Sequence, residues 1–307
     1  MIDLARILLL AVLLTTCVLV SSGQTNTAQL TGIVTDTSGA VVPDTKITVT
    51  NVDTGIGRTT VSNAAGLYTV PVLNPGNYRI KVEQRGFRPV TRSGIALHAN
   101  QAARIDFVLD VGEAKESILV TADAPLLQNE SATLGDLVNQ EAVQDLPLNG
   151  RNFINLAQLT AGANEGLPNA ITSGNRPDER RRTSTVSING QVDVVNNFLI
   201  DGMDNNERGV GTIVVKPSID AIREFKVLTN VYAAEFGRTA GGIINLVTQS
   251  GTNEIHGSLF EFFRNDKLDA KNFFDSPVRP IPPLRQNQYG GSIGGPVSRN
   301  RTFFFGD

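Results

Sequence analysis

Glycines in the second half of the sequence have the type and spacing that could support phosphate binding. Gly237, Gly241 and Gly242 precede the apolar run IINLVTQ, whereas a phosphate-binding loop would lead into a helix. Neither G-x-x-x-x-G-K-[ST] nor G-x-G-x-x-G occurs at this position. These glycines are therefore predicted to let backbone segments approach closely at tight bends.

Two further segments carry charged side chains that could bind an ion. The segment DGMDNNERG, residues 201–209, is acidic and rich in amides, but it lacks the alternating carboxylates and the distal glutamate of a calcium loop. The pattern favours a turn stabilised by Asp and Asn side chains, and no metal site is predicted. Arg180 to Arg182 lie beside Asp178 and Glu179 and are predicted to belong to a solvated loop.

No catalytic residues and no cofactor are predicted. The two histidines, His98 and His256, are far apart in the sequence, and no G-x-S-x-G motif occurs. A lone histidine such as His98 is typically a surface residue or a hydrogen-bonded one. The formal net charge of -3 gives no reason to expect nucleic-acid binding. The sequence therefore does not predict an enzyme.

The first residues have the layout of a secretory signal peptide. Arg6 precedes the apolar stretch 7–20, and Ser21 and Gly23 supply small residues near a cleavage site. The stretch is short for a membrane span, so cleavage after about Gly23 is predicted, with an uncleaved anchor as the alternative. Because Cys17 lies in this segment, the exported chain would contain no cysteine and no disulfide.

Residues 25–112 alternate polar and apolar side chains with the period of a β-strand. Turn sequences such as DTG at 53–55 and NPG at 74–76 interrupt the alternation, and this spacing predicts a small β-sandwich. The segments GIVTDTSGAVVPDTKITVTN and NAAGLYTVPVLNPGNYRIKVEQRGF resemble the carboxypeptidase regulatory-like domain, which implies a prealbumin-like sandwich. The resemblance implies no peptidase activity, because no His/Glu pair at zinc-ligand spacing is present.

A short β-prone run lies in the link at 113–123. It is ESILVTA, formed by Glu116, Ser117, Ile118, Leu119, Val120, Thr121 and Ala122. The run is an ordinary linker, the first strand of the next domain, or an extended peptide that adds as a strand to a partner's sheet edge. It resembles the TonB box of outer-membrane active transporters. The resemblance implies binding to a TonB-type energy transducer in the periplasm.

Residues 124–250 combine helix and strand patterns and predict an α+β domain. A helix from about Val138 is expected to end at Pro147, and a second helix is expected from the cap Asn152 to Gly162. A loop follows, and strands are then expected in TVSINGQ, NNFLIDG and IINLVTQ, while IDAIREFKVLTN is expected to run from a helix-like stretch into a strand.

Residues 252–307 read as strands whose side chains alternate between two faces. In IHGSLFEFFRND, Phe260 and Phe262 share one face, and Leu259 and Phe263 share the other. Two further strands are expected in QNQYGGSIGG and TFFFGD, separated by the polar turn PVSRNR. The aromatic residues belong either to a girdle at a membrane interface or to the core of a soluble hairpin.

The order of these segments resembles that of TonB-dependent receptors, and most of all the Oar-like branch, in which a carboxypeptidase regulatory-like domain precedes the plug. The resemblance rests on VSINGQ, NNFLIDGMDNN and the long run from IDAIREFKVLTN through GGIINLVTQSGTNEIHGSLFEFF. It implies a mainly β chain with an α+β part. The expected order is a sandwich at 25–112, a linker at 113–123, a plug at 124–250 and the first strands of an incomplete outer-membrane β-barrel at 252–307.

The resemblance also implies a function. It points to a receptor of the cell outer membrane that takes up a scarce, unknown solute by energy-coupled transport, with its barrel in outer-membrane lipid and its plug and N-terminal domain facing the periplasm. A barrel that holds a plug has about 22 strands, so the sequence predicts either a fragment of a longer gene product or a truncated remnant. The alternative is a secreted or periplasmic binding or adhesion module with a vestigial plug.

Overall fold

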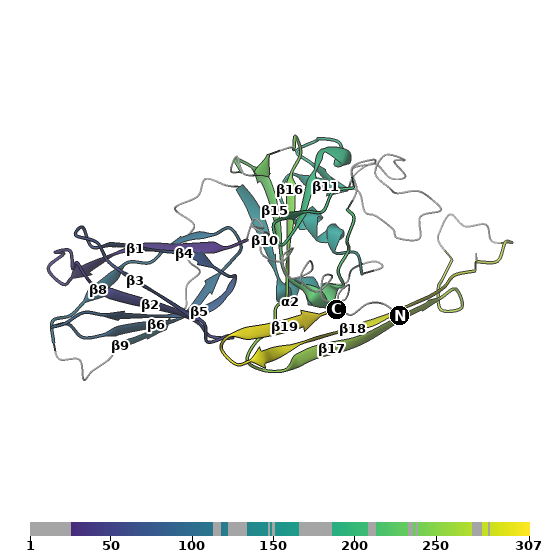
Figure 1. Ribbon diagram of the computed structural model, residues 1–307. Coiled ribbons are helices and arrows are strands. Elements are labelled where there is room, and N and C mark those ends of the chain that lie inside the picture. Colours follow the sequence, from purple (N-terminus) through teal and green to yellow (C-terminus); the bar gives the residue numbers. More distant parts are fainter. Residues whose placement is uncertain are drawn as a thin grey trace, which may run out of the picture.

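The computed structural model describes residues 26–112, 118–121, 134–146, 148, 151–165, 186–207, 213–232, 236–237, 239–271, 278–281 and 283–307. They form a β-sandwich, a central α+β domain and a C-terminal sheet that runs along the central domain (Figure 1). Among these residues, no helix is long and apolar enough to cross a membrane. The predicted signal peptide at 1–23 lies outside the described residues.

The sandwich consists of two sheets of short alternating strands. In the first sheet, β1 (Ala28–Asp36) pairs with β4 (Leu67–Leu73) in an antiparallel manner and with β7 (Ala102–Arg104) and β8 (Phe107–Leu109) in a parallel manner. The second sheet has the order β3-β2-β5-β6-β9. Its strands are β3 (Gly57–Val61), β2 (Lys46–Asn51), β5 (Gly76–Glu83), β6 (Val90–Leu97) and β9 (Ile118–Thr121).

The two sheets bury one face each against a shared apolar core. Alternate residues of β2 and β5 are buried, as the period of a strand with one buried face requires. The core includes Leu30, Ile47, Ile80 and Ile95, all fully buried. The β-sandwich predicted from this alternation is therefore confirmed.

Tyr68 places a buried hydroxyl group within this core. Its side chain is 3% exposed, and its hydroxyl donates a hydrogen bond of 2.7 Å to the carbonyl oxygen of Ile105. Burial raises the pKa of the Tyr68 phenol, because the phenolate would lose its hydration. The hydroxyl therefore remains a donor at pH values where an exposed tyrosine ionises.

We expect Tyr68→Phe to lower the free energy of unfolding by about 1 kcal/mol at neutral pH, because the Ile105 carbonyl loses its partner. Above the ordinary tyrosine pKa of 10.0, the stability of the wild-type chain should fall as pH rises, since the unfolded state releases the phenol proton and the folded state keeps it. Tyr68→Phe should lack the part of the stability loss at alkaline pH that comes from the Tyr68 phenol. Urea denaturation at neutral and alkaline pH measures both effects.

Tyr289→Phe is the matched control, because the Tyr289 side chain is 78% exposed. It should leave both the neutral stability and the alkaline decline unchanged. Identical alkaline declines in the wild-type chain and in Tyr68→Phe would contradict the role given to the buried phenol.

The central domain is built on a mixed sheet of order β10-β15-β16-β13-β14. The strands are β10 (Leu134–Asn139), β15 (Ile222–Asn230), β16 (Ile243–Thr248), β13 (Asn197–Ile200) and β14 (Met203–Asp204). Helix α2 (Gln140–Asp145), the 3-10 helix η3 (Phe153–Leu159), and the paired strands β11 (Ala163–Glu165) and β12 (Val186–Ile188) contribute to the same core. Short 3-10 turns are η5 (Asp193–Val195) and η6 (Ile219–Ala221). The predicted α+β character is confirmed.

The predicted helix boundaries in this domain need correction. Val138 is in β10 and not in a helix, because residues 134–139 pair with β15, and α2 begins only at Gln140. The second helix is a 3-10 helix that ends at Leu159, before Gly162. Its predicted cap is correct, since the Asn152 side chain accepts a hydrogen bond of 3.1 Å from the Ile154 N–H. Most of the expected loop after Gly162, with Arg180 to Arg182, lies outside the described residues.

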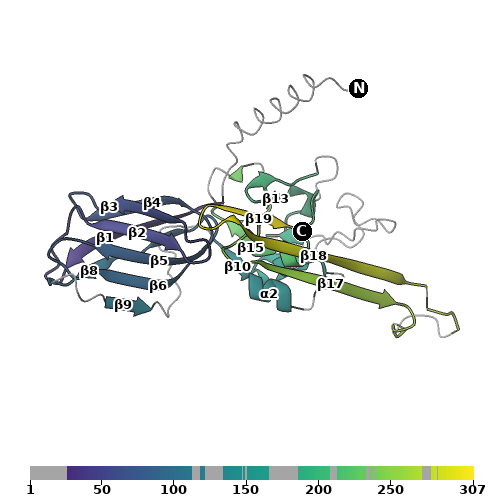
Figure 2. The same cartoon turned by 60° about the horizontal axis from the view of Figure 1, so that its bottom comes forward.

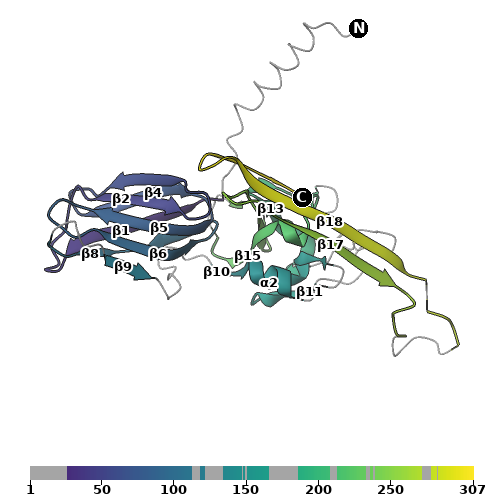
Figure 3. The same ribbon diagram turned by 90° about the horizontal axis from the view of Figure 1, so that it is seen from below.

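The C-terminal sheet has three antiparallel strands, β17 (His256–Asn265), β18 (Arg285–Ser298) and β19 (Thr302–Gly306). Figures 2 and 3 show β17 and β18 as a long ribbon that extends past the central domain. The predicted polar turn PVSRNR is shorter than expected, because β18 continues through Pro296 to Ser298. Proline is tolerated there because the pairing with β17 ends at Gly294, so only β19 pairs with this part of β18.

Candidate functional site

The described part of the predicted TonB-box-like segment forms the edge strand of the sandwich. In β9, Ile118, Leu119, Val120 and Thr121 pair in parallel with Val90, Thr91, Arg92 and Ser93 of β6. Figure 2 shows β9 as the outermost strand of its sheet. Glu116, Ser117 and Ala122 lie outside the described residues. The strand is therefore neither a plain linker nor the first strand of the next domain, because it pairs with the preceding sandwich.

The glycines near β16 have the close-packing role predicted for them. A Cβ atom at Gly241 would overlap the Asn196 side-chain oxygen, and one at Gly242 would overlap the Ile188 side chain. The Gly242 N–H donates a hydrogen bond of 3.0 Å to the same Asn196 oxygen. Because β16 follows directly, these glycines do not open a helix that could hold a phosphate.

The acidic segment that begins at Asp201 forms a turn between β13 and β14. Asp201 has a positive φ of 50°, and its carboxylate accepts hydrogen bonds of 2.9 and 2.7 Å from the backbone N–H and the hydroxyl of Thr248. Asn206 donates to the Asn197 side-chain oxygen at 2.7 Å. The Asp and Asn side chains therefore stabilise the turn and its contact with β16, as the sequence predicted.

The sandwich contacts the central domain through a buried group of charged side chains. His98 Nδ1 lies 3.0 Å from Glu224 Oε1, and the Ala99 N–H donates to Glu224 Oε2 at 3.0 Å. Lys226 Nζ donates to the Ala99 carbonyl oxygen at 3.1 Å. Glu224 and Lys226 are only 6% and 8% exposed. Burial lowers the pKa of Lys226, and the charge of Glu224 acts against that shift.

A pair of amides extends this interface along the same face of the sheet. Asn26 and Asn245 exchange two hydrogen bonds of 3.2 Å, and Asn245 is fully buried. Asn100 donates to the Asn26 oxygen at 3.4 Å. The segment after β6 therefore covers polar residues of β15, and Asn26 covers Asn245 of β16, on the face opposite Phe225 and its apolar core.

The sequence of β15 carries a pattern that indicates this interface. In REFKVL, the charged Glu224 and Lys226 alternate with the apolar Phe225 and Val227, and Leu228 follows. Charged residues in a buried strand indicate that its second face meets polar groups of another segment. The expectation that His98 is a hydrogen-bonded residue is confirmed, and Glu224 is its partner.

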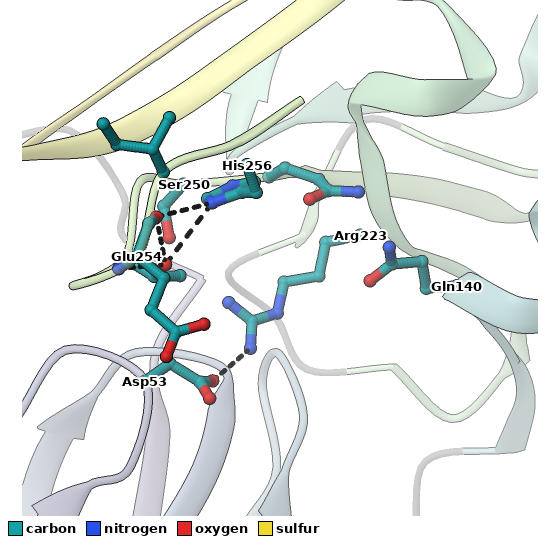
Figure 4. Close-up of a pocket in the computed structure, with 9 residues that line it drawn as sticks. Asp53, Gln140, Arg223, Ser250, Glu254 and His256 are labelled. Carbon is teal, nitrogen blue, oxygen red and sulfur yellow. Dashed lines mark hydrogen bonds and ion pairs between the residues drawn. The ribbon is translucent and has the colours of Figure 1, made fainter. Parts of the chain in front are cut away.

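The loop that leads into β17 lies at the meeting point of the three parts of the chain. The Asn253 N–H donates to the Asp53 carbonyl oxygen at 3.0 Å, and the side chains of Asn253 and Asn300 share a hydrogen bond of 2.9 Å. A cavity of about 250 Å³ lies beside this loop (Figure 4). It is lined by Asp53, Gln140, Arg223, Gln249, Ser250, Thr252, Glu254, Ile255 and His256.

The polar groups in this cavity bond to one another. Arg223 lies 3.8 Å from the Asp53 carboxylate, and His256 Nδ1 lies 3.1 Å from the Glu254 carbonyl oxygen (Figure 4). The Thr252 hydroxyl donates to the same carbonyl at 3.0 Å. The Arg223–Asp53 pair joins β15 to the sandwich, whereas the contacts of Thr252, Glu254 and His256 lie within the segment that leads into β17.

Arg151 joins the central domain to the C-terminal sheet. Its guanidinium donates a hydrogen bond of 2.6 Å to Asp220 and lies 4.8 Å and 4.1 Å from the ring centres of Phe260 and Phe262. The backbone of Arg151 has a positive φ of 53°, a conformation that is uncommon for a residue other than glycine. The predicted face shared by Phe260 and Phe262 is confirmed as the one that meets Arg151, a residue that the sequence did not single out.

The opposite face of the C-terminal sheet exposes apolar side chains. Leu259 is 93% exposed and Phe263 is 58% exposed on β17, and Tyr289 on β18 is 78% exposed. Glu261 pairs with Tyr289, and Leu259 pairs with Gly291, so these residues share one face of the sheet. The sheet thus contacts the central domain with one face and presents large apolar side chains, together with Glu261, on the other.

Comparisons with known proteins agree with this arrangement. Residues 29–110 match the carboxypeptidase regulatory-like domain, and residues 247–307 match the outer membrane beta barrel domain. The TonB-dependent transporter Oar of Myxococcus xanthus is 29% identical over 278 residues, which is 85% of this chain and 24% of Oar. A probable TonB-dependent siderophore receptor, PirA of Acinetobacter baumannii, is 26% identical over 198 residues, covering 60% of this chain and 23% of PirA.

The crystal structure of the siderophore receptor PirA from Acinetobacter baumannii aligns with 56% of this chain and 24% of that receptor, at 22% identity and a TM-score of 0.40. The chain spans about a quarter of the length of the curated relatives it matches, 24% of Oar and 23% of PirA. The sequence matches and the two domain matches occur in the order predicted from the residues. The chain is thus a homologue of the TonB-dependent transporter Oar, and its carboxypeptidase regulatory-like sandwich precedes an α+β domain and strands that match the outer membrane beta barrel domain.

Proposed function

We propose that this chain forms the N-terminal portion of a TonB-dependent outer-membrane receptor that takes up a scarce solute by energy-coupled transport. In this proposal the central domain is the plug that gates the barrel, and residues 113–123 carry the segment that engages a TonB-type energy transducer. The signal peptide at 1–23 directs export, and the sandwich and plug face the periplasm. The outer face of the C-terminal sheet contacts outer-membrane lipid.

The observation that carries this proposal is the two-sided character of the C-terminal sheet. Arg151 contacts Phe260 and Phe262 on the side of the central domain, while Leu259 and Tyr289 are exposed on the opposite side. A barrel wall around a plug needs this division, because its inner face meets protein and its outer face meets hydrocarbon. A soluble hairpin would bury its apolar face instead.

The proposed partner can be tested by cross-linking in cells. Leu119→Cys, placed in the receptor that contains this chain, should form a disulfide with a cysteine in the periplasmic domain of the transducer, because a box strand pairs with its partner through main-chain hydrogen bonds. Leu119→Cys combined with Ile118→Pro should lose the cross-link, since proline removes a backbone donor and restricts the strand. Thr59→Cys, in the edge strand β3 of the same sheet, is the control for non-specific contact.

Membrane fractionation distinguishes this proposal from the alternative. A receptor with a membrane-spanning barrel should sediment with the outer membrane and resist extraction by salt. A secreted or periplasmic binding module would appear in the soluble fraction and would form no cross-link from Leu119→Cys. That result would refute the transport proposal.

A further inference from the structure

We infer that the sandwich moves together with the central domain, and that gating opens the contact between the sandwich and the C-terminal sheet. The inference rests on the proposed function, because it takes the central domain as a plug that shifts against the barrel wall. The sandwich contacts both parts of the chain, so such a shift must break one of its two contacts. The contact that is held less strongly is the one that opens.

The contact with the central domain, called the anchor below, is buried. Glu224 accepts hydrogen bonds from His98 and from the Ala99 N–H, and Lys226 donates to the Ala99 carbonyl oxygen. Glu224 and Lys226 are 6% and 8% exposed, and Ala99 is fully buried. Hydrogen bonds that are shielded from water in this way form a connected network, which is more rigid than the same bonds at a surface.

Further contacts widen the anchor along β15 and β16. Asn26 of the sandwich exchanges two hydrogen bonds of 3.2 Å with the fully buried Asn245 of β16. Arg223 of β15 lies 3.8 Å from the Asp53 carboxylate and against Gly76, where a Cβ atom would be 3.0 Å from the guanidinium. Because these contacts involve two neighbouring strands, they must break together before the sandwich can leave the central domain.

The contact with the C-terminal sheet, called the joint below, is open to water. The Asn253 N–H donates to the Asp53 carbonyl oxygen at 3.0 Å, and the Asn300 side chain lies against Gly55, where a Cβ atom would overlap its amide oxygen. Gly55 and Asn300 are exposed, and Asp53 and Asn253 are half-buried. Water can replace a hydrogen bond at such a site, so the bond contributes little to holding the two parts together.

The cavity of about 250 Å³ lies beside the joint (Figure 4). It is lined by Asp53 from the sandwich and by Thr252, Glu254, Ile255 and His256 from the segment that leads into β17. Atoms beside an open space lack packing partners on that side. Solvent-exposed hydrogen bonds and sparse packing are typical of regions that open first, so the joint should open before the anchor.

Hydrogen exchange in the receptor that contains this chain compares the two contacts. The Ala99 N–H reports on the anchor and the Asn253 N–H reports on the joint, because each donates across its contact. After correction for intrinsic exchange rates, we expect Ala99 to be protected at least about tenfold more than Asn253. Asn300→Gly should lower the protection of Asn253 by about fivefold and leave that of Ala99 unchanged, because it removes the side chain that packs against Gly55.

Asp44→Gly is the matched control for Asn300→Gly. Both residues are exposed and have a positive φ, of 54° at Asp44 and 60° at Asn300, so glycine fits the backbone at either position. Asp44→Gly should change the protection of neither reporter amide. Equal protection of Ala99 and Asn253 in the wild-type receptor, or equal losses at both in Asn300→Gly, would overturn the inference.

Cysteine labelling in cells tests whether the joint opens during gating. A small maleimide should label Asn253→Cys about threefold or more faster in cells that contain the transducer than in cells that lack it. Ala99→Cys, at the anchor, should be labelled equally slowly in both. Faster labelling of Ala99→Cys with the transducer, or equal labelling of Asn253→Cys in both cells, would overturn the inference and leave the proposed function standing. Absence of the Leu119→Cys cross-link to the transducer would overturn both.

Discussion

Glu224→Ala should detach the sandwich from the central domain, at a cost of about 3 to 5 kcal/mol in the free energy of unfolding. Glu224 accepts hydrogen bonds from His98 and from the Ala99 N–H, and it is 6% exposed. Its removal leaves the buried ammonium of Lys226 with its hydrogen bond to the Ala99 carbonyl but without the neighbouring charge of Glu224. Breaking one member of a buried charged pair typically has an effect of this size.

Urea denaturation gives the stability change, and hydrogen exchange gives its location. The Ala99 amide should exchange faster in Glu224→Ala, because its acceptor is gone, while amides in the core of the sandwich should keep their protection. The matched control is Glu83→Ala, since Glu83 pairs with Lys81 on the surface and its side chain is 39% exposed. That change should cost less than about 1 kcal/mol. Equal effects of the two substitutions would contradict a buried interface at Glu224.

Glu224→Gln removes the negative charge of the side chain and keeps nearly the same shape, so it tests the contribution of the charge alone. The amide keeps one oxygen that can accept from Ala99, but it cannot balance the charge of Lys226. We expect Glu224→Gln to lower the free energy of unfolding by more than Glu83→Ala and by less than Glu224→Ala. Because burial lowers the pKa of Lys226 and Glu224 opposes that shift, the pKa should fall further in Glu224→Gln.

The strands of the sandwich were predictable because each buries a single face. In β2 and β5 the apolar residues alternate with polar ones along the whole strand, so the sequence itself carries the period of two. The alternation in β17 is visible for the same reason, and it correctly placed Phe260 and Phe262 on one face. The cap at Asn152 was predictable because its hydrogen bond is local.

The contacts between the parts of the chain were not predictable in this way. His98 and Glu224 are 126 positions apart, and Asn26 and Asn245 are 219 positions apart. No local sequence pattern specifies which polar residue will be the partner over such a separation. A charged residue among apolar ones indicates only that some polar partner exists. The position of β9 was missed for a related reason: its β propensity is visible, but its pairing partner depends on which sheet edge is free.

The mistaken helix start at Val138 shows how tertiary pairing overrides a local pattern. Val138 lies at helical spacing from Ala142, and both contact the same apolar core. However, residues 134–139 pair with β15, which supplies hydrogen-bond partners for an extended backbone, and α2 begins where this pairing ends. The sequence pattern identified the buried residues correctly and assigned the wrong backbone conformation to the first of them.

Arg151→Ala should weaken the contact between the central domain and the C-terminal sheet by about 3 kcal/mol. The change removes the hydrogen bond to Asp220 and the contact of the guanidinium with the Phe260 and Phe262 rings, which together form a partly buried charged cluster. It also leaves the Asp220 carboxylate, whose side chain is 20% exposed, without its cationic partner. Urea denaturation of the chain in detergent, followed by circular dichroism, measures the loss.

Arg151→Lys distinguishes the role of the planar guanidinium from that of the charge alone. Lysine can still pair with Asp220, but an ammonium group cannot stack on the two rings while donating in the fixed geometry of arginine. We therefore expect Arg151→Lys to recover only part of the stability that Arg151→Ala loses. Arg264→Lys is the control on β17, because its side chain is 44% exposed and its ion pair with Asp269 is long, at 3.9 Å.

The comparison of these variants bears on the gating role proposed for the central domain. If Arg151 attaches the plug to the barrel wall, R151A should raise hydrogen exchange in η6 around Asp220 and leave the sandwich amides unchanged, since the contact is confined to the plug and the C-terminal sheet. Full recovery by R151K would show that charge alone holds the plug. An unchanged free energy of unfolding in R151A would mean that other residues hold the central domain against the C-terminal sheet. Arg151 would then have no role in the proposed gating.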